Sequence, residues 1–302
     1  MPRLTVIVLG SAAGGGVPQW NCRCTVCRLA WEGDPRVRRR TQAGLAVSAD
    51  GQSWVLLNAS PDLRTQIQKT AVLQPRDESP RGSPIAAVVL SGAEIDQAAG
   101  LLNLRESQPF SLHATGQTLA IIDNNPMFAA LARDVVLRRA ASFDEFFGLP
   151  GRVEGEFFAV PGKIPLYLEA QSPPADAAPA TNVGIELRAN GARLVFLPGV
   201  AAVTDKILKR LARADAILFD GTLFEDDEMI HLGVGSKTGR RMGHMPIDGA
   251  DGSLAAVAGI KARRIYIHLN NTNPVLIEDS PERRRVEAAG WEVAYDGMEI
   301  ML

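Results

Sequence analysis

The three cysteines of the chain lie within one short loop. Cys22, Cys24 and Cys27 are its only cysteines, and their C-x-C-x-x-C spacing can bring three thiolates to one ion. Tetrahedral zinc accepts three such ligands and takes a fourth from elsewhere in the fold. The odd number argues against a closed disulfide framework. The alternative is a set of buried or redox-active thiols, because Cys24 and Cys27 also form a Cys-x-x-Cys pair, but that motif normally opens a helix and here it follows a glycine loop.

The glycine loop that precedes the cysteines is the second feature. Residues 4–9 are predicted to form a buried strand that runs directly into the glycine-rich residues 10–16. A phosphate-binding loop would end in Gly-Lys-Ser/Thr, whereas this loop is followed by Val17, Pro18 and Gln19, and its spacing is not G-x-G-x-x-G. We therefore expect the glycines to let the backbone pass close to a metal-bound substrate or to a neighbouring strand.

Polar side chains follow three predicted strands. They are Glu94, Asp96 and Gln97 after one strand, Asp220 after a second, and His268, Asn270, Asn271 and Asn273 after a third. Carboxylates and an imidazole at strand ends could converge on a divalent metal. Structural alternatives exist: acids in a first helical turn suit the helix dipole, Asp220 suits a turn before Gly221, and His268 could be a core histidine. The amides after His268 favour a site, because buried amides need partners.

Composition limits the function classes. The chain is 46% hydrophobic and 22% charged with a formal net charge of −2, so it has no basic excess that would indicate nucleic-acid binding. Neither a signal peptide nor an apolar run long enough to span a membrane is evident, and we expect a cytoplasmic protein with reduced cysteines. Its 302 residues allow one large α/β domain or two smaller ones.

Strands and helices are predicted to alternate along the chain in two halves. A hairpin at 41–48 and 53–58, a strand at 85–90 with a helix after it, a helix at 126–139 capped by Asn125, and a loop at 169–181 make up the first half. The second half is predicted as strands at 193–197, 216–219, 264–268, 292–295 and 298–301 with helices at 203–211 and 281–289. Two such halves favour a layered sandwich.

Motifs spread over the whole chain carry a resemblance to a known family. They are GSAAGGGVPQWNCRCTVC from residue 10, NASPDLR from 58, DGTLFEDDEM from 220, TGRRMGHMP from 238, HLNNTNP from 268 and DGMEI from 296. With these motifs the chain resembles the PqqB family of pyrroloquinoline quinone (PQQ) biosynthesis. The resemblance implies one metallo-β-lactamase-like domain over 1–302, a four-layer αββα sandwich of the α/β (α+β) class. It also implies structural zinc at the cysteines, as in the phosphodiesterase branch of that superfamily.

The chain departs from the superfamily at its hydrolase motif. The signature H-x-H-x-D-H falls on Gly92, Glu94, Asp96 and Gln97, so only the aspartate remains. Gly199 stands at the position of the usual bridging aspartate, and residues 182–184 lack the usual histidine. Two metals cannot be held about 3.5–4 Å apart without those ligands, so we expect neither phosphodiesterase nor β-lactamase activity.

His268 keeps the last superfamily histidine, and a mononuclear metal site is therefore the prediction. We place Fe²⁺ on Asp96 and His268, with Glu94, Gln97 and Asp220 as completing ligands, because one imidazole with oxygen ligands favours iron or manganese over zinc. His244 is predicted as an acid or base, or as a residue that fixes its loop. Asn270, Asn273 and Arg240 are predicted to bind the substrate or cofactor. The fourth zinc ligand is an oxygen of Asn271, a backbone carbonyl or a carboxylate.

The resemblance implies two alternative functions. One is an iron-dependent hydroxylase that acts on the tyrosine ring of a Glu-Tyr precursor cut from the PqqA peptide. The other is a non-catalytic protein that binds PQQ or its precursor and carries it towards the periplasm. The expected partners are that small molecule or dipeptide and other proteins of the PQQ pathway, with a homodimer as the assembly; neither nucleic acid nor a membrane is expected.

Overall fold

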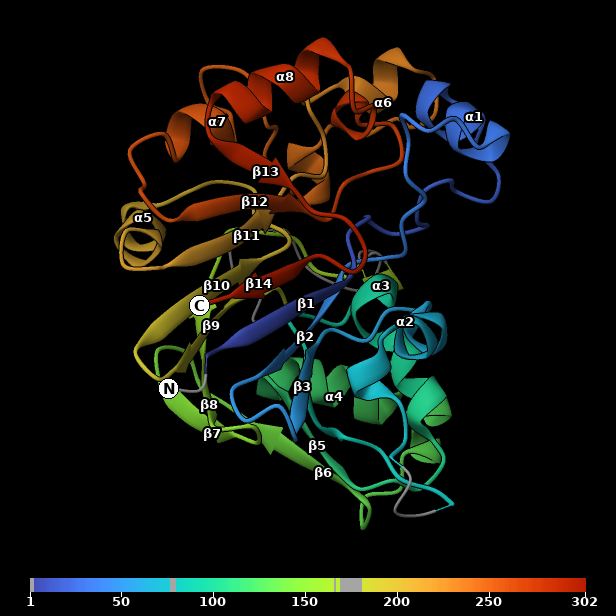
Figure 1. The fold of residues 1–302 in the computed structure, drawn as a ribbon, viewed down its shortest axis with the longest axis vertical. Helices are drawn as coiled ribbons and strands as arrows, with labels where there is room; N and C mark the ends of the chain where they lie inside the picture. The colour runs from blue at the N-terminus through green and yellow to red at the C-terminus, as the bar shows by residue number, and fades with distance from the viewer. Residues whose placement is uncertain (1–2, 77–79, 166, 169–180) are drawn as a thin grey trace.

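Runs of aliphatic and β-branched residues form strands that are buried on both faces. In β1 (Thr5–Gly10) five of six residues are buried, and in β11 (Ala216–Asp220) all five are. Strands covered on both faces are continuously hydrophobic rather than alternating. The computed structural model describes residues 3–76, 80–165, 167–168 and 181–302. Within these residues the strands form two sheets that pack against each other, with helices outside each sheet (Figure 1).

The two sheets have seven strands each. The first has the order β14 (Glu299–Met301), β1, β2 (Gly44–Ser48), β3 (Trp54–Leu57), β4 (Ile85–Val89), β5 (Phe110–Ala114) and β6 (Val136–Ala140). The second has the order β13 (Trp291–Val293), β12 (Arg263–Ile267), β11, β10 (Ala192–Leu197), β9 (Val183–Ala189), β8 (Val153–Ala159) and β7 (Phe146–Leu149). Strands β3 to β6 are parallel to one another, as are β10 to β13, so the carboxyl ends of β4, β11 and β12 can present side chains to one site.

The helices are short and lie outside the sheets. They are α1 (Thr25–Glu32), α2 (Leu63–Lys69), α3 (Ile95–Ala98), α4 (Gly116–Asn124), α5 (Asp205–Leu211), α6 (Glu228–His231), α7 (Ser253–Ala256) and α8 (Pro281–Ala288). Short 3₁₀ helices add η1 (Ala71–Leu73), η2 (Ala99–Leu104), η3 (Pro126–Ala130), η5 (Arg240–Met242) and η6 (Pro274–Leu276). None of the helices among the described residues has the length and apolar character needed to cross a bilayer.

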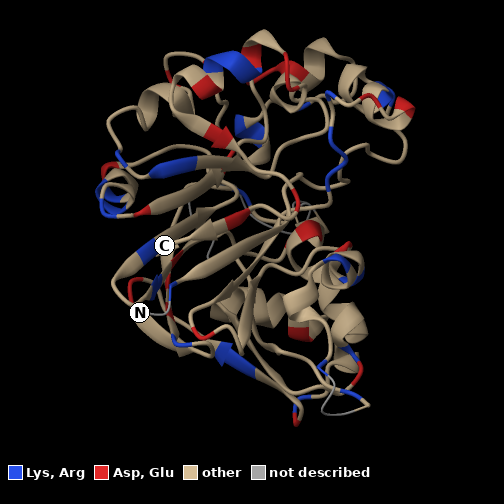
Figure 2. Cartoon of the chain, in the orientation of Figure 1, with Lys and Arg blue, Asp and Glu red and all other residues tan. Residues whose placement is uncertain are grey.

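Three hydrophobic cores fill the spaces between these layers. The central core joins the inner faces of both sheets and contains Val6 and Val47 from the first sheet and Phe196 and Ile265 from the second. A second core lies between the second sheet and α1, α5 and α8, and a third lies between the first sheet and α2 and α4. The predicted αββα sandwich is therefore confirmed, and most charged side chains lie on its outer elements (Figure 2).

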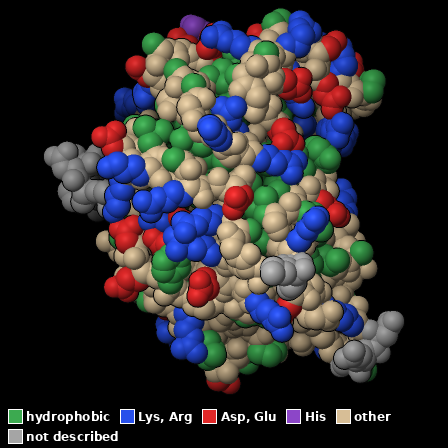
Figure 3. Space-filling model, turned by 60° about the vertical axis from the view of Figure 1, so that its left-hand side comes forward, with side chains coloured by type: hydrophobic (Ala, Val, Ile, Leu, Met, Phe, Trp, Pro, Cys, Tyr) green, Lys and Arg blue, Asp and Glu red, His purple; other side chains and the backbone are tan. Residues whose placement is uncertain are grey.

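The charges on one face pair with each other. Lys and Arg side chains gather beside acidic ones on the face seen in Figure 3. Arg210 of α5 contacts Glu156 at 2.6 Å and Asp144 at 3.0 Å, and Arg188 contacts Glu186 at 2.6 Å. These pairs make an ion-pair network rather than a uniformly basic surface.

Most of the predicted elements are present, but the helix predicted at 126–139 is wrong. Asn125 does accept a hydrogen bond from the Met127 N–H at 3.1 Å, yet the turn that it caps ends at Ala130, and Val136 begins β6, which pairs with β5. The helix of this region is α4, whose Thr115 cap accepts from the Thr118 N–H at 3.2 Å. Of the loop predicted at 169–181, residues 169–180 lie outside the described residues.

Candidate metal centres

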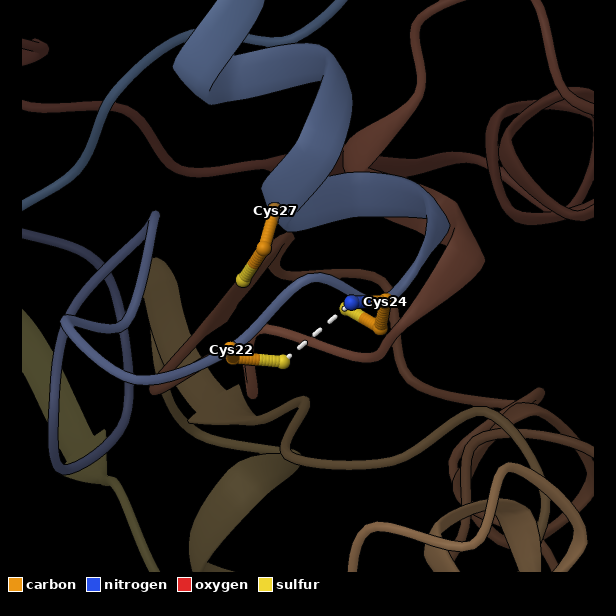
Figure 4. A group of neighbouring side chains, drawn as sticks. All are labelled: Cys22, Cys24 and Cys27. Carbon is orange, nitrogen blue, oxygen red and sulfur yellow. Dashed lines mark hydrogen bonds between the residues drawn. The ribbon is translucent and has the colours of Figure 1, made fainter.

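The three cysteines converge where the loop meets α1. Cys27 lies in the first turn of α1, Cys24 is its N-cap, and Cys22 lies in the loop before it (Figure 4). Their sulfur atoms all lie within 4.8 Å of one another. A tetrahedron with Zn–S bonds of about 2.3 Å separates its sulfur atoms by about 3.8 Å, so the three thiols can close on one zinc ion with small side-chain movements.

Backbone amides around the cysteines favour thiolates. The Gln19 N–H donates to Cys27 Sγ and the Cys24 N–H donates to Cys22 Sγ, each at 3.4 Å. A hydrogen bond from the Cys24 thiol, supported by the Gln19 N–H and Asn271, lowers the pKa of Cys27 to about 5, whereas the same contact and burial raise the pKa of Cys24. Metals bind the thiolate and not the thiol, so this environment prepares the loop for a metal.

Asn271 lies over the three sulfur atoms. Its side-chain amide nitrogen is 3.2 Å from Cys22 Sγ, 3.2 Å from Cys27 Sγ and 3.8 Å from Cys24 Sγ, whereas its backbone oxygen approaches only Cys24 and Cys27, at 3.3 and 3.9 Å. A half-turn of the amide exchanges its nitrogen and oxygen, and a zinc-bound oxygen would lie about 3.5 Å from each sulfur. No carboxylate belongs to this group among the described residues, so the donor set fits zinc with Asn271 as its fourth ligand.

A second cluster lies where β11 and β12 end. Asp220 is the last residue of β11 and His268 follows β12 with a φ of 58°, a conformation that residues other than glycine rarely adopt. His244 comes from the loop after η5, and its ring stacks on that of His268 with centroids 5.1 Å apart. Strained backbone of this kind is concentrated at functional sites.

Thr222, which the sequence did not single out, fixes the hydrogen bonding of this cluster. Its hydroxyl donates to Asp220 Oδ1 at 2.7 Å and so can only accept at 2.8 Å from Nδ1 of His268. The Nδ1 of His244 donates to Asp220 Oδ2 at 2.7 Å. In both imidazoles, therefore, Nε2 is the nitrogen that remains for a ligand or proton.

Asp96 faces His268 across the cluster. Its Oδ2 lies 2.8 Å from His268 Nε2, although the two residues are 172 positions apart in the chain. Burial alone would raise the pKa of Asp96, but its hydrogen bond with His268 and the charge of that ring hold the pKa below the usual value. Burial likewise opposes the charged form of His268, and Asp96 outweighs this so that the pKa of His268 is raised. The pair is an ion pair whose Nε2 proton a metal would displace.

A cavity of about 330 Å³ opens beside this pair. Asp96, Thr222, His244 and His268 line it, and its other walls include Gly14, Gln19, Lys163, Asn182, Met229 and Asn270. A side chain at Gly14 would lie 3.9 Å from Asp96, so the glycine loop brings its backbone to the site as well as to its neighbouring strands. Two imidazoles and one carboxylate on one cavity are the donor set typical of mononuclear iron(II), so the residues fit such an ion.

The predicted completing ligands are engaged elsewhere. Gln97 Oε1 accepts from the Glu94 N–H at 3.1 Å and so closes a capping box at the start of α3. Glu94 pairs with Lys163 at 3.4 Å. Asp220 is fully buried and accepts from the Val200 N–H as well as from His244 and Thr222. Gln97 and Glu94 line the cavity with Asp96, His268 and His244, and the ligand atoms of Asp220, His244 and His268 all lie within 4.8 Å of one another.

Two of the predicted substrate-binding residues do not reach the cavity. Asn273 is fully buried, donates to the Gly221 carbonyl at 2.9 Å and caps η6, so its side chain has a structural role. Arg240 donates to the Asp251 carbonyl at 3.2 Å and is not among the residues that line the cavity. Of the three residues, Asn270 alone lines the cavity. The sequence could not separate it from Asn273, because an asparagine can bind a ligand or cap a turn and only the fold distinguishes the two uses.

The two glycines that stand where the superfamily has metal ligands have close neighbours that leave little room for a side chain. A side chain at Gly92 would overlap the Thr181 carbonyl and Gln97 Oε1. A side chain at Gly199 would meet His244 Cε1 at 3.3 Å. His244 therefore occupies space beside the position of the usual bridging aspartate.

The remaining histidines lie outside both clusters. His113 in β5 is buried, stacks on Phe147 with ring centroids 5.3 Å apart, and has its pKa lowered to about 4 by burial. His231 is exposed and pairs with Asp227 at 3.2 Å. His113 therefore has a packing role and His231 lies on the surface.

Comparisons with known proteins place the chain in a family. The model of the beta-lactamase superfamily domain matches residues 53–269. A relative named coenzyme PQQ synthesis protein B, from Methylorubrum populi, is 54% identical over 298 residues, which cover 98% of this chain and 99% of the relative. This chain belongs to the coenzyme PQQ synthesis protein B family. The resemblance seen in the motifs is thereby confirmed.

Solved structures agree with this assignment. The structure of Zn²⁺-bound PqqB from Methylobacterium extorquens is 54% identical and matches with a TM-score of 0.96 over 99% of this chain and all of that one. A diphosphatase of the PhnP family matches with a TM-score of 0.70 at 20% identity, over 99% of this chain and 97% of that one. The second likeness concerns the fold alone.

Proposed function

We propose that this protein acts in PQQ biosynthesis as an iron-dependent oxygenase that hydroxylates the tyrosine ring of a Glu-Tyr precursor. The observation that carries the proposal is the donor set of Asp96, His244 and His268 on one cavity, in a chain of the PQQ synthesis protein B family. In the balanced reaction, dioxygen supplies the oxygen atom of the new hydroxyl group. A two-electron reductant and two protons convert the second oxygen atom to water.

Each residue of the site has a stated task in this proposal. Asp96 and Nε2 of His268 would hold the ion, and Nε2 of His244 would be the third ligand, because Asp220 engages its Nδ1. Thr222 and Asp220 fix the tautomers of the two rings. The bound iron(II) would supply the activation of dioxygen. If His244 is instead an acid or base, its loss will leave iron affinity unchanged.

The cysteine cluster is proposed to bind a structural zinc ion. Cys22, Cys24, Cys27 and Asn271 supply four donors of the kinds and spacing that zinc uses, and the relative from Methylobacterium extorquens is described as Zn²⁺-bound. All four positions of a tetrahedron would then be filled by protein, which is typical of structural rather than catalytic zinc.

A binding protein for PQQ or its precursor is the second candidate. The observation that favours it is the ion pair between Asp96 and His268, which satisfies both groups without a metal while Glu94 and Gln97 are engaged by their own partners. Cytoplasmic residence, pathway partners and a homodimer are shared by both proposals.

Protein purified without oxygen separates the two functions. The oxygenase should contain about one zinc and one iron per chain and should convert Glu-Tyr to a product 16 Da heavier when oxygen and a reductant are added. His268→Ala should lose the iron and keep the zinc, because the two clusters share no donor. Zinc alone, with Glu-Tyr bound and unchanged, would favour the binding protein.

A further inference from the structure

Three side chains form a hydrogen-bonded chain from the protein interior to the cavity. Glu228 of α6 is buried, and its Oε1 accepts from the Thr272 hydroxyl at 2.5 Å, while its Oε2 accepts from the Phe224 N–H at 2.8 Å. Thr272 Oγ1 also lies 2.5 Å from the side-chain nitrogen of Asn270. Asn270 lines the cavity next to His268.

When Glu228 is ionised, above its pKa of about 7, the direction of each hydrogen bond in this chain is determined. An ionised carboxylate only accepts, so Thr272 must give its single hydroxyl proton to Glu228. Thr272 Oγ1 can then only accept from Asn270, which must turn its NH₂ group towards Thr272. Among the described residues none donates a hydrogen bond to the other end of that amide, Oδ1. The orientation of the amide thus follows from chemistry and not from the coordinates alone.

We infer that Asn270 presents Oδ1 to the cavity as a fixed hydrogen-bond acceptor for a donor on the substrate, and that Glu228 is the positioning residue that fixes it through Thr272. The inference rests on the proposed function for the identity of the donor, which is the phenol O–H of the tyrosine ring beside His268. An amide that could turn freely would accept and donate equally, so it would not discriminate between a ring with a donor and a ring with an acceptor. A fixed amide rejects a ring whose substituent can only accept.

Replacing Glu228 by glutamine should reverse the direction of the hydrogen bonds from residue 228 through Thr272 to Asn270. The Phe224 N–H still needs an acceptor, so the oxygen of the new amide would face it and the NH₂ group of that amide would donate to Thr272. Thr272 would then give its own proton to Asn270, whose amide would turn and present NH₂ to the cavity. The opposite orientation of the new amide leaves two donors facing each other and costs about 1–3 kcal/mol.

The test compares two dipeptides that differ at one ring substituent. Glu-(4-aminophenylalanine) carries a donor and Glu-(4-nitrophenylalanine) carries only acceptors. Their affinities are measured by calorimetry with anaerobic, metal-replete protein at pH 8.5, because burial raises the pKa of Glu228 to about 7 and the carboxylate is ionised above it. The wild type should bind the amino ring at least tenfold more tightly, and Glu228→Gln should lower that ratio at least tenfold.

Glu225→Gln is the matched control, because Glu225 is an exposed acid three residues away that loses the same charge without entering the chain. It should keep the wild-type ratio, and Thr272→Val should bring the ratio near one. An unchanged ratio in Glu228→Gln overturns the inference, even if both affinities fall together, because general damage to the cavity would weaken both dipeptides alike.

A second measurement needs no ligand. Proton exchange of the Asn270 side-chain NH₂ group, followed by NMR with ¹⁵N-asparagine and assigned with Asn270→Asp, should be slow in the wild type and at least tenfold faster in Glu228→Gln. If neither dipeptide binds, the proposed substrate is wrong, and slow exchange that Glu228→Gln accelerates still supports the fixed acceptor. Equal exchange in the two proteins overturns it.

Discussion

The cysteine cluster and the Asp96–His268 cluster differ in what their donors do when no metal is bound. Cys22, Cys24 and Cys27 come from six consecutive residues, and their closest polar contacts are with each other, with Asn271 and with backbone amides. In the second cluster every donor already has a strong partner: Asp96 has His268, and His244 has Asp220.

This difference separates stability from chemistry. Three thiols held together without a metal leave their attraction for an ion unused, so binding of zinc adds directly to the free energy of folding. A metal at the second cluster must first break an ion pair, so it adds less stability and can be exchanged more readily. A protein with one structural ion and one catalytic ion would need the first to be bound tightly and the second to be exchanged more readily.

The largest expected effect is at the cysteines. Cys24→Ser should abolish tight zinc binding and lower the free energy of unfolding by about 4 kcal/mol, because metal-binding energy is folding energy at such sites. Zinc content by element analysis and thermal unfolding should fall together. Arg23→Ala, at the exposed position between two of the ligands, should change neither. Full zinc retention with unchanged stability in Cys24→Ser would contradict a structural zinc site.

A smaller effect, of opposite sign, is expected beside the cavity. Burial raises the pKa of Glu228 from 4.5 to about 7, so the folded protein binds the proton more tightly than the unfolded chain does. Stability from this group is therefore complete below pH 4.5 and is lost as the pH rises through 7, by up to about 3 kcal/mol. In urea unfolding at pH 5 and pH 8, the free energy of unfolding of Glu228→Gln should rise relative to that of the wild type at pH 8.

Glu225→Gln should follow the wild type at both pH values, because that carboxyl is exposed. If Glu228→Gln is no more stable than the wild type at pH 8, the hydrogen bonds of the Glu228 carboxylate offset the cost of burying its charge.

The sequence predicted the cysteine cluster almost completely, because its donors are local and their spacing alone describes the geometry. It also predicted the αββα layers, since hydrophobic runs and family motifs are distributed along the chain. It could not predict that Gln97 caps α3 while Asp96 turns to His268, because both residues lie in one short polar segment. Thr222 and the chain from Glu228 to Asn270 depend on contacts between distant segments, and no local pattern reports them.

The helix predicted at 126–139 failed for a related reason. The Asn-Pro start signal was correct, but a start signal does not set a length, and pairing of β6 with β5 outweighed helix propensity after Ala130.

Gln97→His would make the second cluster more like the first by adding a donor. An imidazole at this position should raise iron(II) affinity by roughly tenfold, about 1.4 kcal/mol, if Asp96 and His268 hold the ion. The substitution also removes the hydrogen bond that Gln97 accepts from the Glu94 N–H and should lower stability by about 1 kcal/mol. Anaerobic titration of the wild type, Gln97→His and Gln97→His with His268→Ala measures the gain. Identical affinities in all three would mean that this cluster is no metal site.

The smallest expected effect is on hydrolysis, where the wild type should convert neither bis(4-nitrophenyl) phosphate nor a β-lactam with added zinc or manganese. Restoring the ligands at positions 92, 94 and 97 as histidines and at 199 as aspartate should not create this activity. A side chain at position 92 meets the Thr181 carbonyl, which belongs to the backbone and cannot turn away, and one at 199 meets His244. The loss of the dinuclear site is thus built into the packing around the cavity and not only into the missing ligands. Turnover by the wild type that Asp96→Ala abolishes would contradict this account of the cavity.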